Sequence, residues 1–428
     1  MPSYDYVILG AGIIGLATAV HLKRLEPQAS VAVVDRGPAP GYGDTGRSMA
    51  AFRVFFTSRL NMLLARSSVE YYMSVQRSGK SLGLRRSGYL FLADRREMER
   101  VKEGLRLAEE LGLNFSLLDP HEAARRVGVN PVVSGSEEAE LLGVGDIEMA
   151  LLVENAGFLD AEKLVEHYYS TARGMGVTFR FNSEAVRLLL KPRRPLGLEY
   201  EPLPWQDPYV AGVQLIDGVT IEAKKAVIAA LGAYASRLLA PSGFDAFTRP
   251  KKRQIFRVQA RGEAARALRE AIFVEGSPPL IVLPRRLLLK PAPEEGSFWV
   301  QLSDEVGRPY GLEGYEPKPE EHYFTYAIAP LLSLYVPSLA ESYPSGAWAG
   351  YYDVSPDGNP VVYSPEDSRL VIAGGTSGSG IMKGDAIGRA AASLAIGHDE
   401  AELYGGERLK LEWLGFKGRL CEEEKLIL

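Results

Sequence analysis

Three glycines near the amino terminus have the spacing that binds the phosphates of a dinucleotide. Gly10, Gly12 and Gly15 follow four apolar residues, 6–9, and open a stretch with helical periodicity. In such a motif the first glycine permits a tight turn, the second lets a pyrophosphate approach the backbone, and the third lets the helix pack against the sheet. Asp35 stands twenty residues after Gly15, where a carboxylate can accept hydrogen bonds from a ribose. The spacing therefore predicts a dinucleotide site.

Buried strands must hold these residues in place. Residues 6–9 and 31–34 are predicted to form two strands joined by the helix that the glycine motif opens. A second unit of the same kind lies far along the chain, with a strand at 370–373, a glycine-rich loop at 374–380 and an alanine-rich helix at 387–396. Such a loop directs backbone N–H groups and a helix N-terminus toward an electron-rich group.

The size and charge of the chain indicate a folded protein of two domains. It has 428 residues, 46% of them hydrophobic, and a formal net charge of -5 without a basic tail or stripe. We therefore expect no nucleic acid partner. The apolar N-terminus lacks the basic start of a signal peptide, and no run of eighteen apolar residues could span a membrane. We expect a cytoplasmic protein.

The rare residue types narrow the chemistry further. The single cysteine, Cys421, excludes an intrachain disulfide framework and an iron–sulfur cluster, and the five histidines are scattered without ligand spacing. We assign no metal site. Few asparagines and glutamines accompany many arginines, glutamates and prolines, a composition typical of proteins from hot environments. A thermophilic source is the resulting hypothesis.

The remaining chain predicts alternating helices and strands around one insertion. Helical patterns cover about 60–76, 95–111 and 161–174, and strand patterns cover 87–92, 177–181 and 225–230. Five prolines between 192 and 208 exclude a helix or a central strand, and predict a surface loop between two strands of a hairpin. Short alternating runs from about 250 to 344 predict an antiparallel sheet in a second domain.

With these motifs in this order, nearly the whole chain resembles the FAD-dependent oxidoreductases of the D-amino-acid oxidase and sarcosine oxidase superfamily. The resemblance rests on the first unit and on segments 44–48, 227–233, 354–360 and 375–388. It implies an α/β fold in which a Rossmann-like FAD-binding domain is interleaved with an α+β substrate domain built on an antiparallel sheet. We expect residues 1–85, 145–240 and 345–428 to form the FAD-binding domain, and residues 86–144 and 241–344 to form the substrate domain.

The resemblance also implies which residues hold an extended FAD. The glycine motif would contact the pyrophosphate, segment 45–50 would run along the pyrophosphate and the flavin, and the loop before the last helix would face the flavin pyrimidine. The residues implied as cofactor contacts are Gly10, Gly12, Ile13, Ile14, Gly15, Asp35, Arg36, Thr45, Gly46, Arg47, Ser48, Met49, Ala50, Ala185, Val186, Gly232, Gly375, Ser379, Gly380, Ile381 and Met382.

Two departures from the family pattern bear on the chemistry. In sarcosine oxidases a cysteine binds the flavin covalently, but the corresponding segment, 348–353, contains none. We therefore expect non-covalent FAD. Those oxidases also carry a lysine on a strand over the flavin that promotes reaction with oxygen, and the apparent counterpart, 298–300, has none. The second departure favours a dehydrogenase that passes electrons to a dye, a quinone or a carrier protein.

The substrate side offers few candidates. Amine oxidation on this scaffold is hydride transfer to flavin N5, so no catalytic residue is assigned, but an amino-acid carboxylate needs a cation. Arg53 is the first candidate, with an ordinary ion pair as its alternative. Lys383 is the second, although a solvated lysine on the first turn of a helix is the favoured explanation and family members often place the lysine at the position of Met382. Strand alternation allows at most one of Tyr351 and Tyr352 to line the site, and Tyr351 is the candidate.

The resemblance favours an FAD-dependent dehydrogenase that oxidises the C–N bond of a small amino acid, first L-proline and then sarcosine, as in dye-linked L-proline dehydrogenases. The alternatives are an oxidase of the sarcosine, glycine or D-amino-acid type, and an FAD subunit of a multi-component electron-transfer complex. An enzyme that oxidises hydroxy acids or glycerol phosphate would need a base, typically histidine, and the motif segments contain none. A homo-oligomer is compatible with the sequence. The apolar C-terminus, 425–428, is either a tail that shields the site or one packed on its own subunit.

Overall fold

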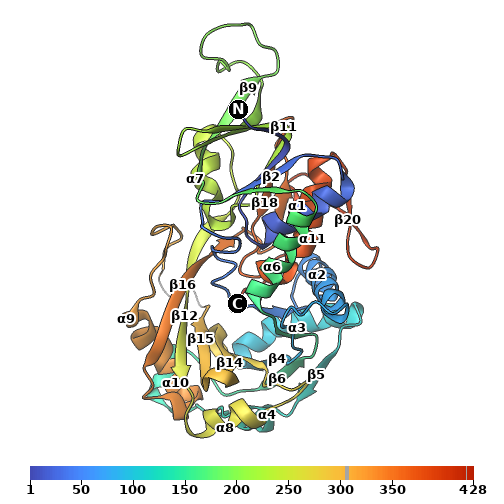
Figure 1. The fold of residues 1–428 in the computed structure, drawn as a ribbon. Coiled ribbons are helices and arrows are strands. Elements are labelled where there is room, and N and C mark those ends of the chain that lie inside the picture. Colours follow the sequence, from blue (N-terminus) through green and yellow to red (C-terminus); the bar gives the residue numbers. More distant parts are fainter. Residues whose placement is uncertain (304–307, 421) are drawn as a thin grey trace.

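Two large sheets divide the chain, one in the upper half of Figure 1 and one in the lower half. A computed structural model describes residues 1–303, 308–420 and 422–428. Cys421 lies outside the described residues. The C-terminus ends between the two halves of the molecule, whereas the N-terminus lies near the top.

The first sheet has the predicted parallel core. Its main order is β17-β18-β11-β1-β2-β8, and β1 pairs in parallel with both β11 and β2. Only β17 runs antiparallel to its neighbour along this path. The strands are β1 (Ser3–Leu9), β2 (Val31–Val34), β8 (Thr178–Arg180), β11 (Thr220–Ala229), β17 (Val361–Tyr363) and β18 (Leu370–Gly374).

Both faces of this sheet are buried, because side chains alternate between its two faces along each strand. Tyr6 and Ile8 of β1 face one buried core, whereas Val7 and Leu9 face another. The first core is covered by α1 (Ile13–Leu25), α2 (Arg59–Arg77), α6 (Ala161–Gly174) and α11 (Gly380–Ala395), which lie together in Figure 1. The second core includes α7 (Ala235–Leu239).

Helix α11 begins at Gly380, earlier than the predicted start at residue 387. The prediction was wrong because glycines interrupt the apolar pattern, yet two of them serve the packing against α1. A Cβ atom on Gly384 would lie 2.5 Å from the Ile13 side chain, and one on Gly388 would lie 2.5 Å from that of Ala17. The glycines therefore let the two helices approach closely, so that both N-termini open on the same side of the sheet.

The second sheet has the order β16-β12-β15-β14-β13-β4-β6-β5. Its pairs are antiparallel except β4 with β13, which is parallel. The strands are β4 (Tyr89–Ala93), β5 (Phe115–Leu118), β6 (Met149–Val153), β12 (Arg249–Gln259), β13 (Leu280–Leu283), β14 (Leu287–Ala292), β15 (Ser297–Leu302) and β16 (Pro344–Val354). The helices of this half are α3 (Arg95–Glu110), α4 (Pro120–Arg126), α5 (Glu137–Leu142), α8 (Gly262–Glu270), α9 (Glu321–Tyr323) and α10 (Ala329–Tyr335).

Strand pairing bears on the expected domain boundaries. β6 pairs with β4 and β5, and β16 pairs with β12, so both belong to the second sheet. The expected boundaries at 145 and 345 assign them to the first domain. Both strands lie close to the expected boundaries in the sequence, but they pair with strands of the second sheet. Smaller pairs complete the fold: β3 (Ala51–Arg53) with β7 (Ala156–Phe158), and β19 (Glu400–Glu402) with β20 (Arg408–Lys410).

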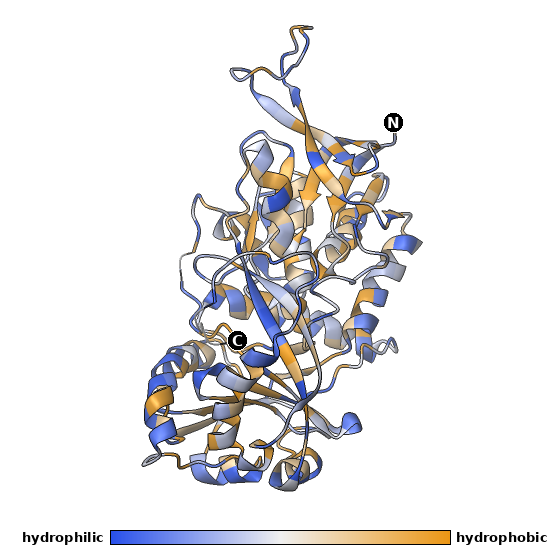
Figure 2. Ribbon diagram, turned by 90° about the vertical axis from the view of Figure 1, so that its left-hand side faces the viewer, coloured by the Kyte–Doolittle hydropathy of each residue, from blue (hydrophilic) through white to orange (hydrophobic). Residues whose placement is uncertain are grey.

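Local signals place several elements as predicted. Asp160 caps α6 by accepting hydrogen bonds from the N–H groups of Glu162 and Lys163. The proline-rich insertion joins β9 (Ala185–Pro192) to β10 (Pro208–Leu215), and the hairpin forms an arm that projects beyond the first sheet (Figure 1). Its tip carries hydrophobic as well as hydrophilic residues (Figure 2). Of the helices in the described part of the chain, none has the length and apolar character needed to cross a membrane.

Candidate active site

The glycine motif adopts the turn that its spacing predicts. Gly10 follows β1 with φ of +103°, and a Cβ atom there would lie 2.3 Å from the carbonyl oxygen of Ala230. A Cβ atom on Gly15 would lie 1.9 Å from the carbonyl oxygen of Gly10. Only glycine fits at both positions, because one requires a left-handed backbone and the other a close helix–strand contact.

Asp35 lies at the end of β2, beside this turn. Its two carboxylate oxygens accept hydrogen bonds from the N–H groups of Ala11 and Gly37, each at 2.6 Å. The carboxylate is thus held next to the glycine motif.

A single large cavity of about 820 Å³ connects most of the residues that the resemblance implied. It reaches from Asp35 to Arg53 and Tyr351. The implied cofactor residues on its wall are Gly10, Gly12, Ile13, Ile14, Asp35, Arg36, Thr45, Arg47, Ser48, Met49, Ala50, Ala185, Val186, Gly232, Ser379, Gly380, Ile381 and Met382. Segments separated by hundreds of residues therefore share one site.

Three implied residues shape the cavity without lying on its wall, namely Gly15, Gly46 and Gly375. A Cβ atom on Gly46 would lie 2.7 Å from the carbonyl oxygen of Gly41. Gly375 has φ of +67°, and its Cβ atom would lie 2.9 Å from the Val361 side chain. These glycines set the path of the backbone that carries the neighbouring wall residues.

The hydrogen-bond donors of the cavity suit a group with phosphate and carbonyl oxygens. Helices α1 and α11 begin at N-cap residues Gly12 and Ser379, neither of which caps its helix through a side-chain hydrogen bond. The first residues of both helices line the cavity, and although the Ile13 N–H donates to the Thr45 hydroxyl at 3.2 Å, the positive ends of both helix dipoles lie at its wall. Within the described residues, Nη1 of Arg47 is buried and has no hydrogen-bond partner. An anionic dinucleotide fits this set of donors.

Besides Asp35, two further aspartates lie on the wall. Burial raises the pKa of Asp44 to about 6, although the Tyr351 N–H donates to its Oδ1 atom at 2.9 Å. Burial raises the pKa of Asp353 as well, while its Oδ1 accepts from the Thr376 hydroxyl at 2.6 Å. Among the described residues, histidine, cysteine, aspartate and glutamate form no group of three or more that could hold a metal ion.

Arg53 is a buried cation at the other end of the cavity. Its residue is 3% exposed, and its guanidinium lies 4.1 Å from the centre of the Phe56 ring. Nη1 donates to the carbonyl oxygen of Phe55, and Nη2 donates to that of Leu426 at 2.5 Å. Burial lowers the pKa of Arg53, and the nearby Glu424 carboxylate opposes that shift.

Lys383 does not lie on the cavity wall. The residue is fully buried, and its Nζ atom donates to Oδ1 of Asn61 and to the Ser379 hydroxyl at 2.6 Å. Burial lowers the pKa of Lys383 well below its usual range. The structure therefore places this lysine behind the loop at Ser379, away from solvent and from the cavity wall.

Both tyrosines of β16 line the cavity, contrary to the expectation that at most one would. Tyr351 packs edge-on against Tyr234, with ring centres 5.8 Å apart. Tyr352 covers Gly378, where a Cβ atom would lie 2.2 Å from the ring, and its hydroxyl accepts a hydrogen bond from Gln301 at 3.0 Å. The cavity passes both faces of the strand, so alternation does not exclude either ring.

A lysine that sequence reasoning missed lies beside segment 45–50, which the resemblance places along the flavin. Lys290 of β14 donates from Nζ to the carbonyl oxygen of Met49 at 2.6 Å, and lies 4.0 Å from the centre of the Trp299 ring. Burial lowers the pKa of Lys290 to about 8. The sequence search considered segment 298–300, whereas the lysine stands on the neighbouring strand.

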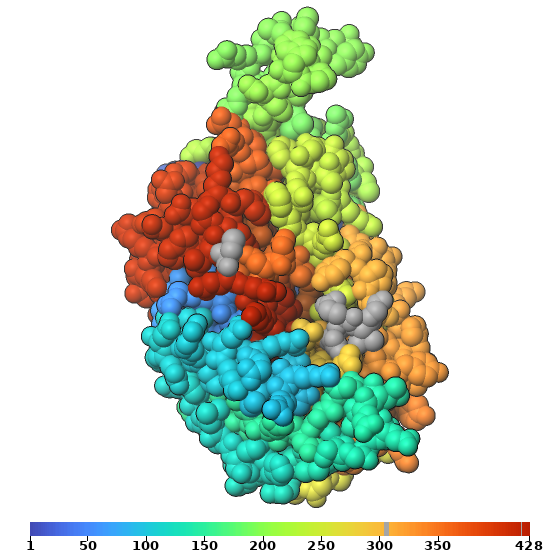
Figure 3. Space-filling view, turned by 180° about the vertical axis from the view of Figure 1, so that it is seen from behind, coloured from blue at the N-terminus to red at the C-terminus, as the bar shows by residue number. Residues whose placement is uncertain are grey.

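The C-terminal tail enters the same region. Leu426, Ile427 and Leu428 lie on the cavity wall. Upstream, the buried carboxylate of Glu424 accepts hydrogen bonds from the N–H groups of Thr57 and Ser58, each at 3.1 Å. Figure 3 shows the red C-terminal segment lying against the blue and cyan surface of the earlier chain. The tail is therefore docked at the seam between the halves.

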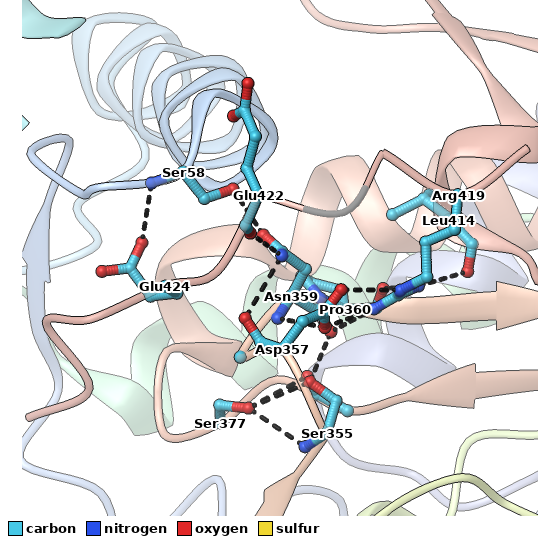
Figure 4. Close-up of polar contacts among 12 residues, drawn as sticks. Ser58, Ser355, Asp357, Asn359, Pro360, Ser377, Leu414, Arg419, Glu422 and Glu424 are labelled. Atoms are coloured by element: carbon cyan, nitrogen blue, oxygen red, sulfur yellow. Dashed lines mark hydrogen bonds and ion pairs between the residues drawn. The ribbon is translucent and has the colours of Figure 1, made fainter.

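Segment 354–360, one of the family-like motifs, anchors the chain that leads to this tail (Figure 4). Asp357 forms an ion pair with Arg419 at 2.7 Å, and Nδ2 of Asn359 donates to the carbonyl oxygen of Glu422 at 2.6 Å. Oδ1 of Asn359 also accepts from the Ser58 hydroxyl at 2.5 Å. The motif thus joins the N-terminus of α2 to the C-terminal segment.

A parallel α/β sheet with a dinucleotide turn faces a mainly antiparallel sheet across one cavity, and this arrangement is typical of flavin-dependent oxidoreductases. A model of the FAD dependent oxidoreductase (DAO) family matches residues 5–394. The chain therefore belongs to this family and uses FAD. The FAD-dependent oxidoreductase domain-containing protein 1 of Xenopus laevis is 24% identical over an alignment that covers 92% of this chain and 79% of that protein.

Solved structures share the fold. L-proline dehydrogenase from P. horikoshii superposes with a TM-score of 0.73 at 22% identity, covering 97% of each chain. Glycine oxidase from Geobacillus kaustophilus superposes with a TM-score of 0.68 at 18% identity, covering 93% of this chain and 96% of that chain.

Proposed function

We propose that the protein is an FAD-dependent dehydrogenase of a small amino acid with a secondary amine, with L-proline as the favoured substrate. The observation that carries the proposal is Arg53, a buried cation on the wall of the cavity that also holds the cofactor residues. A guanidinium is suited to a carboxylate, and the apolar side chains of Phe56 and Leu288 on the same wall are suited to a small ring. The likeness to L-proline dehydrogenase supports this choice.

In this proposal the chain would bind FAD and the amine substrate within the same cavity. FAD, when bound, supplies the acceptor for a hydride from the carbon next to the amine nitrogen. The N-termini of α1 and α11 and the guanidinium of Arg47 would donate hydrogen bonds to the cofactor. Arg53 orients the substrate carboxylate, and the apolar wall excludes water. No histidine is among the described residues that line the cavity, which suits a reaction without a dedicated base.

The first experiment is an anaerobic absorption spectrum of the purified protein before and after L-proline is added. We expect flavin bands that bleach with L-proline and bleach more slowly, at equal concentration, with sarcosine, glycine or D-proline. Bleaching by sarcosine or glycine alone would replace L-proline by the oxidase-type substrates. Bands that no amino acid bleaches would overturn the proposal.

Replacing Arg53 tests the carboxylate contact. We expect Arg53→Met to lower kcat/KM for L-proline about 100-fold or more, because a charge-assisted hydrogen-bond pair is lost. Pyrrolidine has the same ring without a carboxylate, so its kcat/KM should be unaffected by the substitution. Arg59→Met is the control, since that arginine is exposed and paired with Glu110. An equal loss for both amines would assign Arg53 a structural role.

The acceptor distinguishes the proposed dehydrogenase from an oxidase. Lys290 favours the oxidase, because the sarcosine oxidases that the chain resembles carry a lysine over the flavin, and Lys290 lies beside segment 45–50. We propose a dye, a quinone or a carrier as the acceptor, so the bleached flavin should be reoxidised faster by a dye than by air. Rapid reoxidation by air that is lost in Lys290→Met would establish the oxidase.

The remaining parts of the proposal concern assembly and setting. We propose non-covalent FAD, which acid denaturation should release into the supernatant. Dye reduction by the chain purified alone would exclude a role confined to a larger electron-transfer complex. A homo-oligomer in the cytoplasm completes the proposal, and sedimentation tests the oligomer. Exposed apolar residues on the arm favour association, namely Leu196, Leu198, Tyr200 and Trp205.

A further inference from the structure

One segment of the lower half crosses to the upper half and covers the cofactor cavity. We call residues 311–316 the strap. At its start, the Gly311 N–H donates to the carbonyl oxygen of Pro250 at 2.8 Å. The Glu313 N–H then donates to the Tyr351 hydroxyl at 2.7 Å, and its carboxylate pairs with Lys252 at 2.5 Å. The start of the strap is thus fixed to β12 and β16.

The end of the strap contacts loops of the upper half instead. The carbonyl oxygen of Tyr315 accepts a hydrogen bond from the Tyr234 hydroxyl at 2.9 Å, and the Tyr315 hydroxyl donates to the Glu184 carboxylate. Oε1 of Glu316 accepts a hydrogen bond from the Tyr42 hydroxyl at 3.1 Å. Three hydrogen bonds therefore join the strap to three separate segments of the upper half.

Stacked cations strengthen the same junction. The guanidinium of Arg36 lies 4.0 Å from the centre of the Tyr234 ring and 3.9 Å from that of the Tyr315 ring. Arg237 lies 4.3 Å from the centre of the Tyr315 ring. An arginine between two aromatic rings is held by cation–π attraction and by apolar contact.

The position of these contacts identifies what they enclose. Arg36 directly follows Asp35, and Glu184 directly precedes Ala185. Asp35 and Ala185 lie on the wall of the cavity at the end expected for the adenosine. Tyr315 and Glu316 lie on the wall as well. The strap thus closes the cavity where the chain would hold the adenosine of FAD.

The contacts are also placed so that they can separate. Tyr315 is 37% exposed and Tyr42 is 50% exposed. Side-chain bonds at the surface compete with water and contribute little individually. The end of the strap can therefore separate from the loops of the upper half without disturbing a buried core, whereas its start stays paired to β12 and β16.

We propose that the strap is a clasp that retains FAD: it closes over the adenosine end and must open before the cofactor enters or leaves. A small number of contacts between the two halves then retains FAD, as a covalent bond to the flavin does in other flavoproteins. The clasp rests on the use of FAD and is independent of which amine is oxidised.

The rate of FAD release tests the clasp without any substrate. The holoenzyme is diluted into buffer, and the rise of free-flavin fluorescence is followed. We expect Tyr315→Ala to release FAD at least tenfold faster than wild type, because the ring between Arg36 and Arg237 and the bond to Glu184 are lost together. We expect Tyr42→Phe, which removes one hydroxyl, to release FAD two- to fivefold faster.

Tyr326→Ala is the matched control, since Tyr326 is 79% exposed and lies away from the cavity wall. It should release FAD at the wild-type rate. If Tyr315→Ala and Tyr42→Phe both release FAD within twofold of wild type, the clasp is refuted. If Tyr315→Ala fails to fold, Tyr42→Phe alone decides, because removing an exposed hydroxyl leaves the packing in place. FAD release is measured without any amine, so a failure of every amine to bleach the wild-type flavin would overturn the proposed function and leave the test of the clasp unaffected.

Discussion

At the scale of single residues, the titration of Asp44 should make the free energy of unfolding depend on pH. Burial raises its pKa from the ordinary 3.8 to about 6. Because the folded state then holds the proton more tightly than the unfolded state, the free energy of unfolding should fall as pH rises from about 4 to about 6, and change no further above that range. Asp44→Asn removes this titration but keeps an oxygen for the Tyr351 N–H. Relative to wild type, we expect the FAD-free variant to gain about 2–3 kcal/mol between pH 4 and pH 7.

Urea unfolding of both FAD-free proteins at pH 4, 5, 6 and 7 checks this expectation. The change in the difference between the two proteins is the result of interest, since the substitution also alters packing by a constant amount. A difference that stays the same at all four pH values would show that Asp44 does not titrate in this range.

Residues near the active site differ in how far sequence could place them. Asp35 follows a local rule, because one strand, one turn and one helix bring it beside Gly10. Tyr352 and Lys290 obey no such rule: their positions depend on which strands pair in the second sheet, and β14 meets β15 through a register that no local motif reveals. The contact of Arg36 with Tyr315 joins residues far apart in sequence. The sequence alone therefore indicated the kind of chemistry, whereas contacts between residues far apart in sequence could be identified only from the fold.

At the scale of elements, the close packing of α1 and α11 predicts a sensitive glycine. A Cβ atom on Gly388 would lie 2.5 Å from the Ala17 side chain and 2.8 Å from its backbone. Gly388→Ala should therefore push the helices apart and lower the free energy of unfolding by about 1–3 kcal/mol. FAD affinity should fall with it, since both helix N-termini face the cavity.

Gly174→Ala provides the control in a helix with free space. Gly174 is the last residue of α6, and a Cβ atom there would meet nothing within 4 Å. That variant should be unchanged or more stable by up to about 1 kcal/mol. Thermal or urea unfolding of the two variants decides the matter, and equal stabilities would argue against tight packing at Gly388.

One carboxylate contributes several of the bonds that hold the docked tail. Glu424 accepts bonds from the Thr57 and Ser58 N–H groups, so Glu424→Ala should free the last residues from the seam. We expect carboxypeptidase to shorten this variant at least about tenfold faster than wild type, as the loss of charge-assisted bonds predicts. Glu423→Ala, at an exposed position, should be cut at the wild-type rate. Mass spectrometry of the digests measures both, and equal rates would mean that the tail is held by its apolar residues alone.

At the scale of the whole molecule, composition and ion pairs predict resistance to heat. Besides few asparagines and glutamines, the chain has a linked set of charges in which Glu313 and Glu320 each pair with both Lys252 and Arg308. Networks of this kind stabilise more at high temperature than isolated pairs do. We expect a thermal unfolding midpoint above about 80 °C by calorimetry. A midpoint in the mesophilic range of about 45–65 °C would contradict a thermophilic origin.

The two-sheet plan itself followed from sequence, because each half carries its own periodicity and the glycine units mark the cofactor side. The seam was harder to predict. β6 and β16 lie close to the expected boundaries yet pair in the second sheet, and only strand pairing reveals this. Likewise, nothing local to residues 425–428 indicates that they meet Arg53 and the cavity wall.

The docked tail has a practical consequence for anyone who produces this protein. A purification tag fused after Leu428 would extend from a residue on the wall of the cavity, between the two halves of the molecule. A tag before Met1 would begin at an exposed residue near the far end of the first sheet, where it meets no part of the site. Affinity handles, fluorescent fusions and surface-immobilisation linkers therefore belong at the N-terminus.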